Sequence, residues 1–233
     1  MYRRGVIEER LTRLASLRGD SAKGLPTSAW STNLDDLDRD LLLRAVIHVT
    51  RVLMIPEWES KRKEDRRPQL ALEAAEGWLA TKSPESIANA KAVAKDCTAA
   101  RNETFGTDHR IPEAARACAW AVAAKDNTHI WDALQSIEED HLARIALVAE
   151  YHRVPEVRKA ILAALRTVLV PTPTAAAPTS TGPVPYAASG HFEVGQKLTH
   201  PKFGNLVVTA SVDKTIDVQL DDGTTKRLAQ KPK

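Results

Sequence analysis

Apolar residues recur at every third or fourth position over most of the first 170 residues, which is the period of an amphipathic helix. A first helix is predicted over residues 7–17 and ends at Gly19. A second helix is predicted to begin at a cap, Asn33 or Asp35, and to end at Pro56. Because apolar residues cover most of the circumference of this second helix, we expect it at the centre of a helical body.

Prolines and capping residues mark where the remaining helices begin. Pro68 starts a helix that reaches Leu79, since proline is tolerated in the first turn. Ser83 and Pro84 provide a cap and a first-turn proline for the next helix. Three further helices are predicted to start near Pro112, at Asn127 or Thr128, and at Pro155. The helix faces are rich in alanine, and the large side chains predicted to anchor this core are Trp78, Trp120 and Trp131.

A charged segment, residues 57–67, separates the second helix from the helix that starts at Pro68. It contains five basic and four acidic residues around a single tryptophan, Trp58. A mixed charge run of this kind is typical of a solvated connection. The alternative is a binding site for a protein partner, and the predicted contact residues are then Arg62, Arg66 and Arg67.

The order of these features over residues 40–150 carries a family resemblance. A hydrophobic helix, Leu41 to Ile55, precedes a charged loop that ends in Asp-Arg-Arg-Pro and a helix of the form P-x-x-A-L-x-A-A-x-x-W-L, from Pro68 to Leu79. Alanine-rich helices follow. This order resembles the helical Imm-5-like immunity proteins of bacterial polymorphic toxin systems. The resemblance implies a non-enzymatic protein that binds a cognate toxin and neutralises it by occluding it.

The composition changes abruptly after Val170. Residues 171–190 are rich in Pro, Thr and Ala and have little to bury, which predicts an extended, flexible linker. From Phe192 onward, apolar and polar residues alternate as in strands, with predicted turns at residues 201–205 and 221–223. Because a few short antiparallel strands bury a core only by curling, we predict a small barrel over residues 191–233. The predicted class is therefore a helical bundle over residues 1–170 joined to a small β unit.

The predicted barrel carries a second resemblance. The run V-G-Q-K-L-T-H-P-K-F-G, from Val194 to Gly204, precedes the strand Ile216 to Leu220 and the run G-T-T-K-R-L, from Gly223 to Leu228. This order resembles the Tudor-like (SH3-like) barrel at the C-terminus of UvrD/PcrA-type DNA helicases, although Leu206 stands where that pattern has a second glycine. In those helicases the module is associated with RNA polymerase, and similar barrels bind proteins or nucleic acid. The resemblance implies an adaptor that docks on RNA polymerase or another nucleic-acid machine.

The contact residues predicted on the barrel are Lys202, Phe203, Lys226 and Arg227. The three charged ones are expected to be exposed. The alternative for Phe203 is that it only builds the barrel together with His200, Pro201 and Gly204. Residues 192–233 hold seven basic and five acidic residues, a balance too even to predict phosphate binding from charge alone. No helicase motor is encoded, because the sequence has no G-x-x-x-x-G-K-[ST] phosphate loop.

The net charge, the cysteines and the lack of long apolar runs limit the classes of protein to which this chain can belong. The 33 basic and 30 acidic residues leave a net charge of only +3, without the strong positive footprint of a dedicated nucleic-acid binder. Cys97 and Cys118 lie in helical segments and form no C-x-x-C pair, so we predict buried thiols in a reducing cytoplasm. No apolar run approaches the roughly 20 residues that span a bilayer, and the N-terminus lacks the apolar core of a secretory signal. We therefore expect a cytoplasmic protein with no membrane partner.

The strongest hint of an enzyme is a single Glu-x-x-His, formed by Glu138 and His141 on one predicted helix. Di-metal helical bundles need a second copy and two further glutamates on facing helices, and the sequence has no second copy. We therefore predict a solvated acidic face with one histidine. No serine or cysteine stands in a recognisable nucleophile motif. The prediction is a non-enzymatic, protein-binding chain without cofactor or metal.

Overall fold

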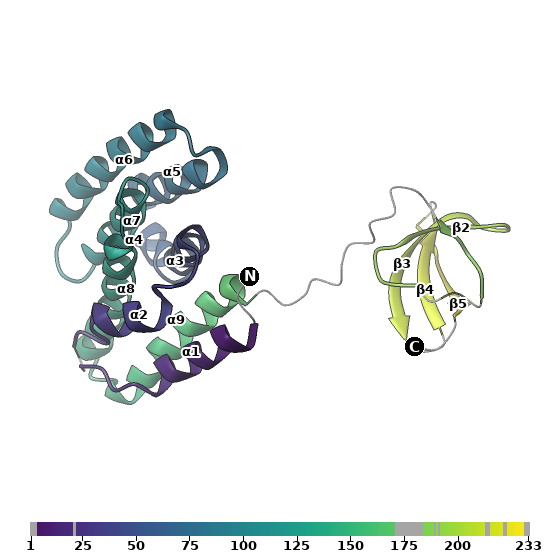
Figure 1. The fold of residues 1–233 in the computed structure, drawn as a ribbon, viewed down its shortest axis with the longest axis horizontal. Coiled ribbons are helices and arrows are strands. Elements are labelled where there is room, and N and C mark those ends of the chain that lie inside the picture. The colour runs from purple at the N-terminus through teal and green to yellow at the C-terminus, as the bar shows by residue number, and fades with distance from the viewer. Residues whose placement is uncertain are drawn as a thin grey trace. The chain divides into compact units, whose positions relative to one another are not determined.

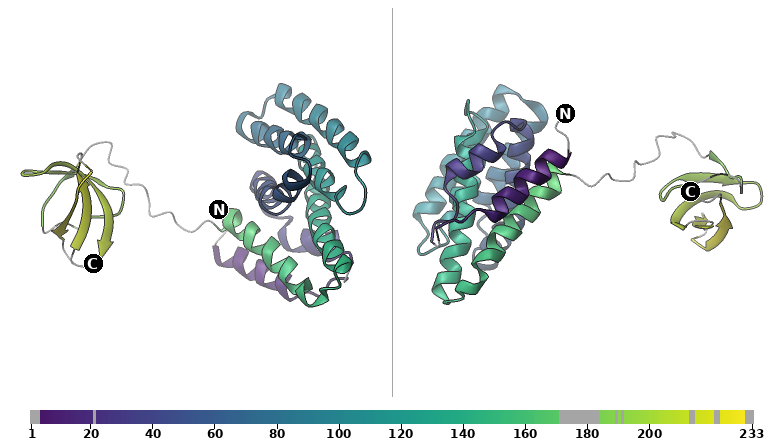
Figure 2. Two further views of the ribbon diagram at one scale, coloured as in Figure 1. Left: turned by 180° about the vertical axis from the view of Figure 1, so that it is seen from behind. Right: turned by 60° about the horizontal axis from the view of Figure 1, so that its bottom comes forward.

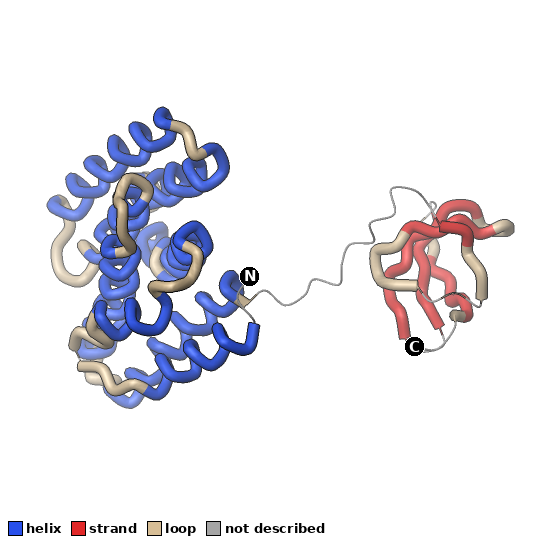
Figure 3. Tube along the Cα trace, in the orientation of Figure 1, coloured by secondary structure: helices blue, strands red, loops and turns tan. Residues whose placement is uncertain are grey.

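The computed structural model describes residues 4–20, 22–170, 184–188, 190, 192–212, 215–220 and 223–230. Contacts divide the chain into two compact units, Met1–Pro171 and Thr172–Lys233. The helices belong to the first unit and the strands to the second, so the predicted class of a helical body with a small β unit is confirmed (Figure 3). Residues 171–183, the greater part of the predicted linker, lie outside the described residues. None of the helices described is both long enough and apolar enough to cross a membrane.

The described part of the first unit, here called the helical unit, contains nine α-helices and one short 3₁₀ helix (Figure 1). They are α1 (Arg4–Ser16), α2 (Thr27–Leu34), α3 (Arg39–Leu53), α4 (Ile55–Lys61), α5 (Arg67–Thr81), α6 (Pro84–Asn102), α7 (Arg110–Ala121), α8 (Thr128–Leu147), η1 (Tyr151–Arg153) and α9 (Val154–Leu169). α3 packs against α5, α7, α8 and α9, which confirms the predicted central position of this helix. α1 lies beside α9 in both views of Figure 2, and the two helices are in contact.

The second predicted helix is interrupted in the structure. α2 ends at Leu34 and α3 begins at Arg39, so neither Asn33 nor Asp35 caps the central helix. The Asn33 side chain instead donates to the carbonyl of Ala29 within α2. The cap of α3 is Asp38, whose carboxylate accepts a hydrogen bond from the backbone N–H of Leu41 at 2.9 Å. The prediction of the cap was wrong because several Asn and Asp side chains lie close together in the sequence. The sequence alone does not show at which of them the helix begins.

The charged segment over residues 57–67 is largely exposed, as predicted for a solvated connection, but it is not a simple loop. Its first half forms α4, with Pro56 in the first turn of that helix. Trp58 is only 1% exposed, and its indole N–H donates to the carbonyl of Asp65 at 2.6 Å. Pro56 therefore follows the end of α3 and lies in the first turn of α4, and the buried Trp58 anchors α4 in the helical unit.

Other helix starts and anchors follow the predictions closely. Pro68 lies in the first turn of α5, and Ser83 caps α6 by accepting from the N–H of Ser86 at 3.1 Å. Trp78 and Trp131 are buried as predicted, whereas Trp120 is only partly buried against the core. Among the largest fully buried side chains are Trp30 and Trp58, which the helical periodicity did not single out.

The described part of the second unit, here called the sheet unit, contains five strands in the order β1-β2-β3-β4-β5. They are β1 (Val184–Pro185), β2 (Lys197–His200), β3 (Gly204–Val212), β4 (Thr215–Leu220) and β5 (Thr225–Ala229). β1 runs parallel to β2, and the other neighbours pair antiparallel. The buried apolar side chains of the described residues are Phe192, Leu198, Leu206, Val208, Ile216 and Val218, so the alternation along β3 and β4 predicts most of their inward faces, while Leu220 is only partly buried. The sheet begins earlier than predicted, since β1 falls within the stretch assigned to the linker.

The predicted barrel is not closed, because the strand order leaves β1 and β5 as the two edges of an open mixed sheet. β1 has only two residues, and Pro185 has no N–H to donate to a neighbouring strand. Two side chains link the ends of the unit instead. The hydroxyl of Tyr186 donates to the carbonyl of Ala229 at 2.8 Å, and Gln230 Oε1 accepts from the N–H of Phe192 at 3.0 Å. Of the predicted turn at residues 221–223, Asp221 and Asp222 lie outside the described residues.

Candidate functional site

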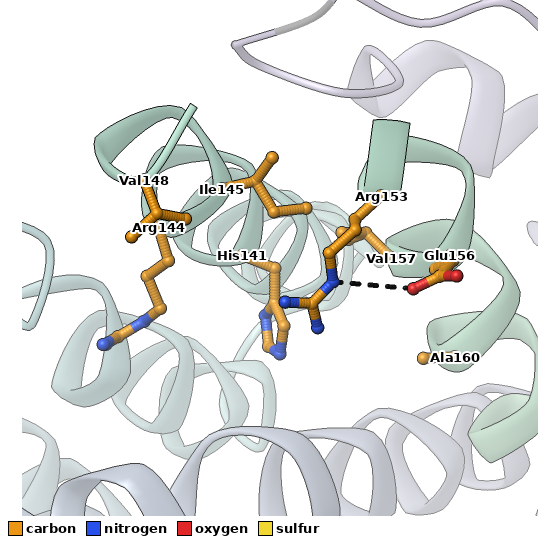
Figure 4. A pocket seen from close by; sticks show the side chains of 8 residues that line it. All are labelled: His141, Arg144, Ile145, Val148, Arg153, Glu156, Val157 and Ala160. Carbon is orange, nitrogen blue, oxygen red and sulfur yellow. Dashed lines mark ion pairs between the residues drawn. The ribbon is translucent and has the colours of Figure 1, made fainter. Parts of the chain in front are cut away.

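A groove of about 470 Å³ opens between the last turns of α8, η1 and the first turns of α9 (Figure 4). We call it the α8–α9 groove. Its apolar lining is Ile145, Val148, Val157 and Ala160, and its polar lining is His141, Arg144, Arg153 and Glu156. A volume of this size and a lining of apolar walls with a few polar groups are typical of binding sites.

The end of α8 and the turn after it carry exposed apolar side chains, one of which lines this groove. Eight large apolar side chains of the described residues are exposed, and three of them, Leu147, Val148 and Tyr151, fall within five consecutive positions. Val148 also lines the groove. Single exposed apolar residues are normal on a protein surface, whereas a cluster marks a contact site.

Backbone geometry explains why these side chains point outward. Ala149 adopts the left-handed conformation with φ of 56°, and the N–H of Glu150 bonds to the carbonyl of Ile145 at 3.1 Å. This is the hydrogen bond of a Schellman motif, which ends a helix and reverses the chain. The reversal carries the chain from α8 through η1 into α9 and leaves the groove between them.

Arg144 lines the groove and is the centre of an ion-pair network. It contacts three carboxylates: Asp140 at 2.7 Å, Glu57 at 2.8 Å and Asp108 at 3.0 Å. Asp140 has a side chain only 2% exposed, so Arg144 compensates a buried charge. Lys61 joins the network through Glu57 at 2.8 Å and Asp108 at 3.0 Å. The guanidinium of Arg144 points away from Arg153 and Glu156 in Figure 4, so it holds α8 against α4 and the α6–α7 loop.

These ion pairs shift the pKa values of the carboxyl groups. Hydrogen bonding from Lys61 lowers the pKa of Glu57, and hydrogen bonding from Arg67 lowers the pKa values of Asp65 and Glu103. Burial acts to raise the pKa of Asp108, but contacts with Lys61 and Arg144 outweigh it and the pKa is lowered. All four groups are therefore better stabilised as carboxylates in the folded chain than in the unfolded one.

Acidification is expected to destabilise the helical unit through these four carboxylates. Because their folded-state pKa values are lowered, their stabilisation is complete above the ordinary values of 3.8 for aspartate and 4.5 for glutamate. It is lost as the pH falls through the lower folded-state values. The melting temperature followed by tryptophan fluorescence should hold between neutral pH and about pH 5 and drop below about pH 4. An unchanged melting temperature at about pH 3 would contradict this assignment.

The Glu138 and His141 pair does not form a common site. Glu138 is 1% exposed and accepts from the N–H of Leu25 at 2.9 Å and from Arg158 at 2.9 and 3.1 Å. Gly24 packs so closely on this carboxylate that a Cβ there would lie 2.2 Å from the Glu138 Cδ. His141 donates from Nδ1 to the carbonyl of Ile137 and lies between Arg144 and Arg153 in Figure 4. The predicted solvated acidic face is wrong, because a tertiary partner on α9 buries the carboxylate.

Neither metal nor thiol chemistry stands out among the described residues. They contain no group of three or more His, Cys, Asp and Glu side chains placed to hold a metal ion. Cys97 and Cys118 are free and buried, as predicted, and burial raises the pKa of each thiol to about 12. Thiols with such pKa values are almost fully protonated at neutral pH and are poor nucleophiles.

The three arginines predicted as contacts lie near the turn between α4 and α5. Arg67 is bound to Asp65 at 2.7 Å and to Glu103 at 2.5 Å. Arg66 pairs with Glu73 at 3.0 Å but keeps a side chain 63% exposed. The Arg62 guanidinium lies 5.2 Å from the centre of the Trp58 ring. Arg66 is therefore the most accessible of the three, whereas Arg67 serves the fold by tying α5 to Glu103.

The loop that follows Glu103 carries an aromatic residue that periodicity did not single out. Phe105 is 88% exposed, and Gly106 beside it has a positive φ of 70°. Glu103 is bound to Arg67, and Asp108 is bound to Lys61 and Arg144, so both ends of the loop are held. A bulky Phe-Gly step within a polar stretch was the signal that would have drawn attention to it.

The contact residues predicted on the sheet unit fall into two places. Lys202 and Phe203 lie in the turn between β2 and β3, with the Lys202 Nζ 5.8 Å from the Phe203 ring centre. Phe203 stacks on His200 at 4.6 Å, and His200 meets Tyr186 at 4.9 Å. Lys226 and Arg227 lie on β5, where Arg227 pairs with Asp217 at 2.7 Å. The structure therefore places one pair in a turn and the other on a strand.

The α8–α9 groove thus combines an apolar lining that includes the exposed Val148 with charged groups held in ion pairs. The arginines at the α4–α5 turn and the aromatic row of the sheet unit are separate surfaces. Comparison with known proteins finds no family model, no curated protein and no solved structure that matches this chain.

Proposed function

We propose that this chain is a non-catalytic protein-binding protein whose helical unit contacts its partner at the α8–α9 groove. The observation that carries the proposal is a groove of about 470 Å³ lined by the exposed Val148, whose neighbours along the chain, Leu147 and Tyr151, are also exposed apolar residues. Burying such a cluster against a partner is favourable by roughly 25 cal/mol per Å² of apolar surface. Arg144 and Arg153 line the groove and form ion pairs with carboxylates of the same unit, which fix the positions of their side chains.

A finer proposal is that the partner is a bacterial toxin that the helical unit occludes. It is supported by the resemblance of residues 40–150 to Imm-5-like immunity proteins. Occlusion needs only a stable complementary surface, and an apolar groove on a rigid helical body suits it. The groove borders the segment that carries the resemblance, since α8 extends to Leu147.

An adaptor that docks on RNA polymerase through the sheet unit is the alternative. It is supported by the resemblance of that unit to the helicase module and by the row of rings formed by Tyr186, His200 and Phe203. Partly exposed aromatic side chains are enriched in protein interfaces. In this alternative, Lys202 and Phe203 make the contact, and their replacement by alanine in the full chain removes polymerase capture.

The groove proposal is tested by affinity purification of the native partner on the full chain. The double variant Leu147→Ser/Val148→Ser is expected to weaken capture by about tenfold, because it removes the exposed apolar surface of Val148, which lines the groove, and of its neighbour Leu147. A matched control is Val52→Ser/Leu70→Ser, which removes exposed apolar residues from α3 and α5. Equal capture by both variants and the parent chain, with unchanged melting temperatures, would show that the groove is not the contact surface.

Charge reversal at Arg66 is expected to weaken partner binding if the α4–α5 turn also takes part. Arg66→Glu should change the stability of the fold little, because the side chain is 63% exposed and its ion pair with Glu73 lies at the surface. Arg67→Glu should instead destabilise the helical unit, since it places a carboxylate against Asp65 and Glu103. Titration of the isolated partner against folded Arg66→Glu decides the matter, and an unchanged affinity removes Arg66 from the interface.

A further inference from the structure

β5 is one of the two edge strands of the open sheet, and its outer side is accessible. β4 pairs along one side of β5, and no strand of the described residues pairs along the other (Figure 1). Four of the five residues of β5 are exposed, and the fifth, Leu228, is half-buried. The other edge strand, β1, has only two residues and includes Pro185, which lacks an N–H. β5 therefore offers the longer edge for pairing with a further strand.

The hairpin that joins β4 to β5 determines which backbone groups of β5 face outward. The N–H of Leu220 donates to the carbonyl of Thr224 at 2.9 Å, so these two residues form a hydrogen-bonded pair. Hydrogen-bonded and non-hydrogen-bonded pairs alternate along an antiparallel ladder, and the register of β4 with β5 continues without a shift from Thr225 to Ala229. Thr225 and Arg227 therefore fall in non-hydrogen-bonded pairs, and their N–H and C=O groups point away from β4.

The hydroxyl of Tyr186 supports this alternation independently. It donates to the carbonyl of Ala229 at 2.8 Å, and Tyr186 belongs to a segment other than β4. Ala229 lies two residues after Arg227, so its carbonyl points to the same outer side as the carbonyls of Thr225 and Arg227. Tyr186 occupies this side at Ala229, whereas the outward backbone groups of Thr225 and Arg227 have no partner among the described residues.

These backbone groups specify the conformation of an occupant. N–H and C=O groups that face outward at every second residue match the edge of another extended strand, which presents the same groups at the same spacing. A helix satisfies its backbone groups internally and has none to offer along its sides. Strand addition at an exposed sheet edge is one of the recurring ways in which proteins bind peptides. The occupant that fits the outer edge of β5 is therefore an extended peptide segment.

The charge of β5 restricts which extended segment fits. Lys226 and Arg227 are exposed, and the sequence has no acidic residue from Gly223 to Lys233, although residues 221–222 are both Asp. Arg227 pairs with Asp217 at 2.7 Å, whereas Lys226 forms no ion pair with a described residue. Opposite charges on paired strands stabilise the pairing, and like charges destabilise it. A segment with a carboxylate opposite Lys226 is therefore favoured.

A second copy of this chain fits the same edge less well. Two antiparallel copies of β5 would bring Lys226 and Arg227 of one copy close to those of the other, and like charges opposite each other oppose pairing. Lysine on an edge strand is a common protection against self-association. The same lysine does not oppose an acidic strand.

We propose that the outer edge of β5 binds an extended acidic segment of a partner protein as an additional strand, paired with the backbone of Thr225 and Arg227 and with a carboxylate near Lys226. This inference goes beyond the proposed function, because it assigns a second contact surface that does not involve the α8–α9 groove. It also differs from the adaptor alternative, in which Lys202 and Phe203 make the contact.

The test uses the full chain and short synthetic peptides in which threonine alternates with glutamate or with lysine. At low ionic strength the glutamate peptide is expected to bind with saturation at one peptide per chain, at least about tenfold more tightly than the lysine peptide. A third peptide has the glutamate sequence with every internal backbone N–H methylated. It keeps the charge but lacks the donors, and it should bind at least about tenfold more weakly than the unmethylated glutamate peptide.

Hydrogen exchange followed by NMR locates the contact on the chain. Without peptide, the outward N–H groups of Thr225 and Arg227 should exchange faster than those of Lys226 and Leu228, which bond to β4. The glutamate peptide should slow the exchange at Thr225 and Arg227. An unchanged exchange rate at both residues when the peptide is bound would overturn the proposal.

A charge reversal on β5 tests the role of the lysine. Lys226→Glu should weaken the glutamate peptide by at least about fivefold. The matched control is Lys197→Glu on β2, an exposed lysine of the same unit whose reversal makes the same change in net charge. The control variant should bind the glutamate peptide as the parent chain does.

Three further outcomes would overturn the proposal: no saturable binding of the glutamate peptide, equal binding of the methylated peptide, or equal weakening by Lys226→Glu and Lys197→Glu. Failure of the proposed function gives a different result, namely native partner capture that Leu147→Ser/Val148→Ser leaves unchanged. Because the two tests concern different units of the chain, either proposal can fail without the other.

Discussion

Replacing Glu138 with alanine is expected to lower the free energy of unfolding of the helical unit by about 3–5 kcal/mol. The Glu138 side chain is 2% exposed and forms an ion pair with Arg158, whose side chain is 15% exposed. Removing the carboxylate leaves the Arg158 guanidinium partly buried without this anion and leaves the N–H of Leu25 without its acceptor. Both changes leave a polar group without its hydrogen-bond partner inside the packed unit, where water does not replace that partner. Each therefore lowers the free energy of unfolding.

Urea unfolding followed by tryptophan fluorescence measures this effect cleanly. All five tryptophans lie between residues 30 and 131, so the signal reports the helical unit alone. The control is Glu76→Ala, which removes an exposed ion pair with Arg51 and should cost no more than about 1 kcal/mol. A loss for Glu138→Ala as small as that of the control would mean that the buried pair contributes nothing to stability.

Replacing Trp58 with alanine is expected to cost a similar amount, about 3–5 kcal/mol. The indole is 1% exposed and anchors α4, and its N–H holds the carbonyl of Asp65 at 2.6 Å. Alanine would leave a cavity and an unpaired carbonyl at the start of the turn into α5. Trp58→Phe retains most of the packing and should cost less, chiefly the hydrogen bond of about 1 kcal/mol and the volume difference.

Far-UV circular dichroism in urea is the suitable measurement for these variants, because each removes a fluorophore. Trp120→Ala is the matched control, since Trp120 belongs to α7 but is only partly buried. Its loss should be clearly smaller than that of Trp58→Ala. Equal losses would indicate that burial does not distinguish the two positions and that α4 is not anchored by its tryptophan.

The elements that the sequence predicted best are those set by local chemistry. Proline and serine place the starts of α5 and α6, and the alternation of apolar residues identifies the inward faces of β3 and β4. Such signals depend on backbone rules that act within a few residues. They need no knowledge of the remaining fold.

The parts that were mispredicted depend on contacts between distant segments. α4 has only seven residues, too few to show a clear helical period. Charged residues flank Trp58 in the sequence, so its burial could not be predicted from the pattern. Glu138 has an acidic neighbourhood along the chain, but its partners are Arg158 on α9 and the backbone of Leu25. The α8–α9 groove was not predicted because it arises from the reversal at Ala149, a residue with no special turn preference. Spacing along one helix does not reveal any of these partners.

The contacts of Glu138 and Arg158 with the segment after α1 also bear on the order in which the chain folds during synthesis. Arg158 donates to the carbonyl of Leu17, and Glu138 accepts from the N–H of Leu25. The segment after α1 therefore gains these hydrogen bonds only when residues more than a hundred positions further along the chain have been synthesised. α1 itself rests on α9, where Arg166 pairs with Glu8 at 2.8 Å. At roughly 5–20 residues per second, a ribosome leaves this N-terminal segment without its partners for several seconds or more. During that interval the apolar face of α1 is available to chaperones, and it becomes inaccessible only once α9 has emerged.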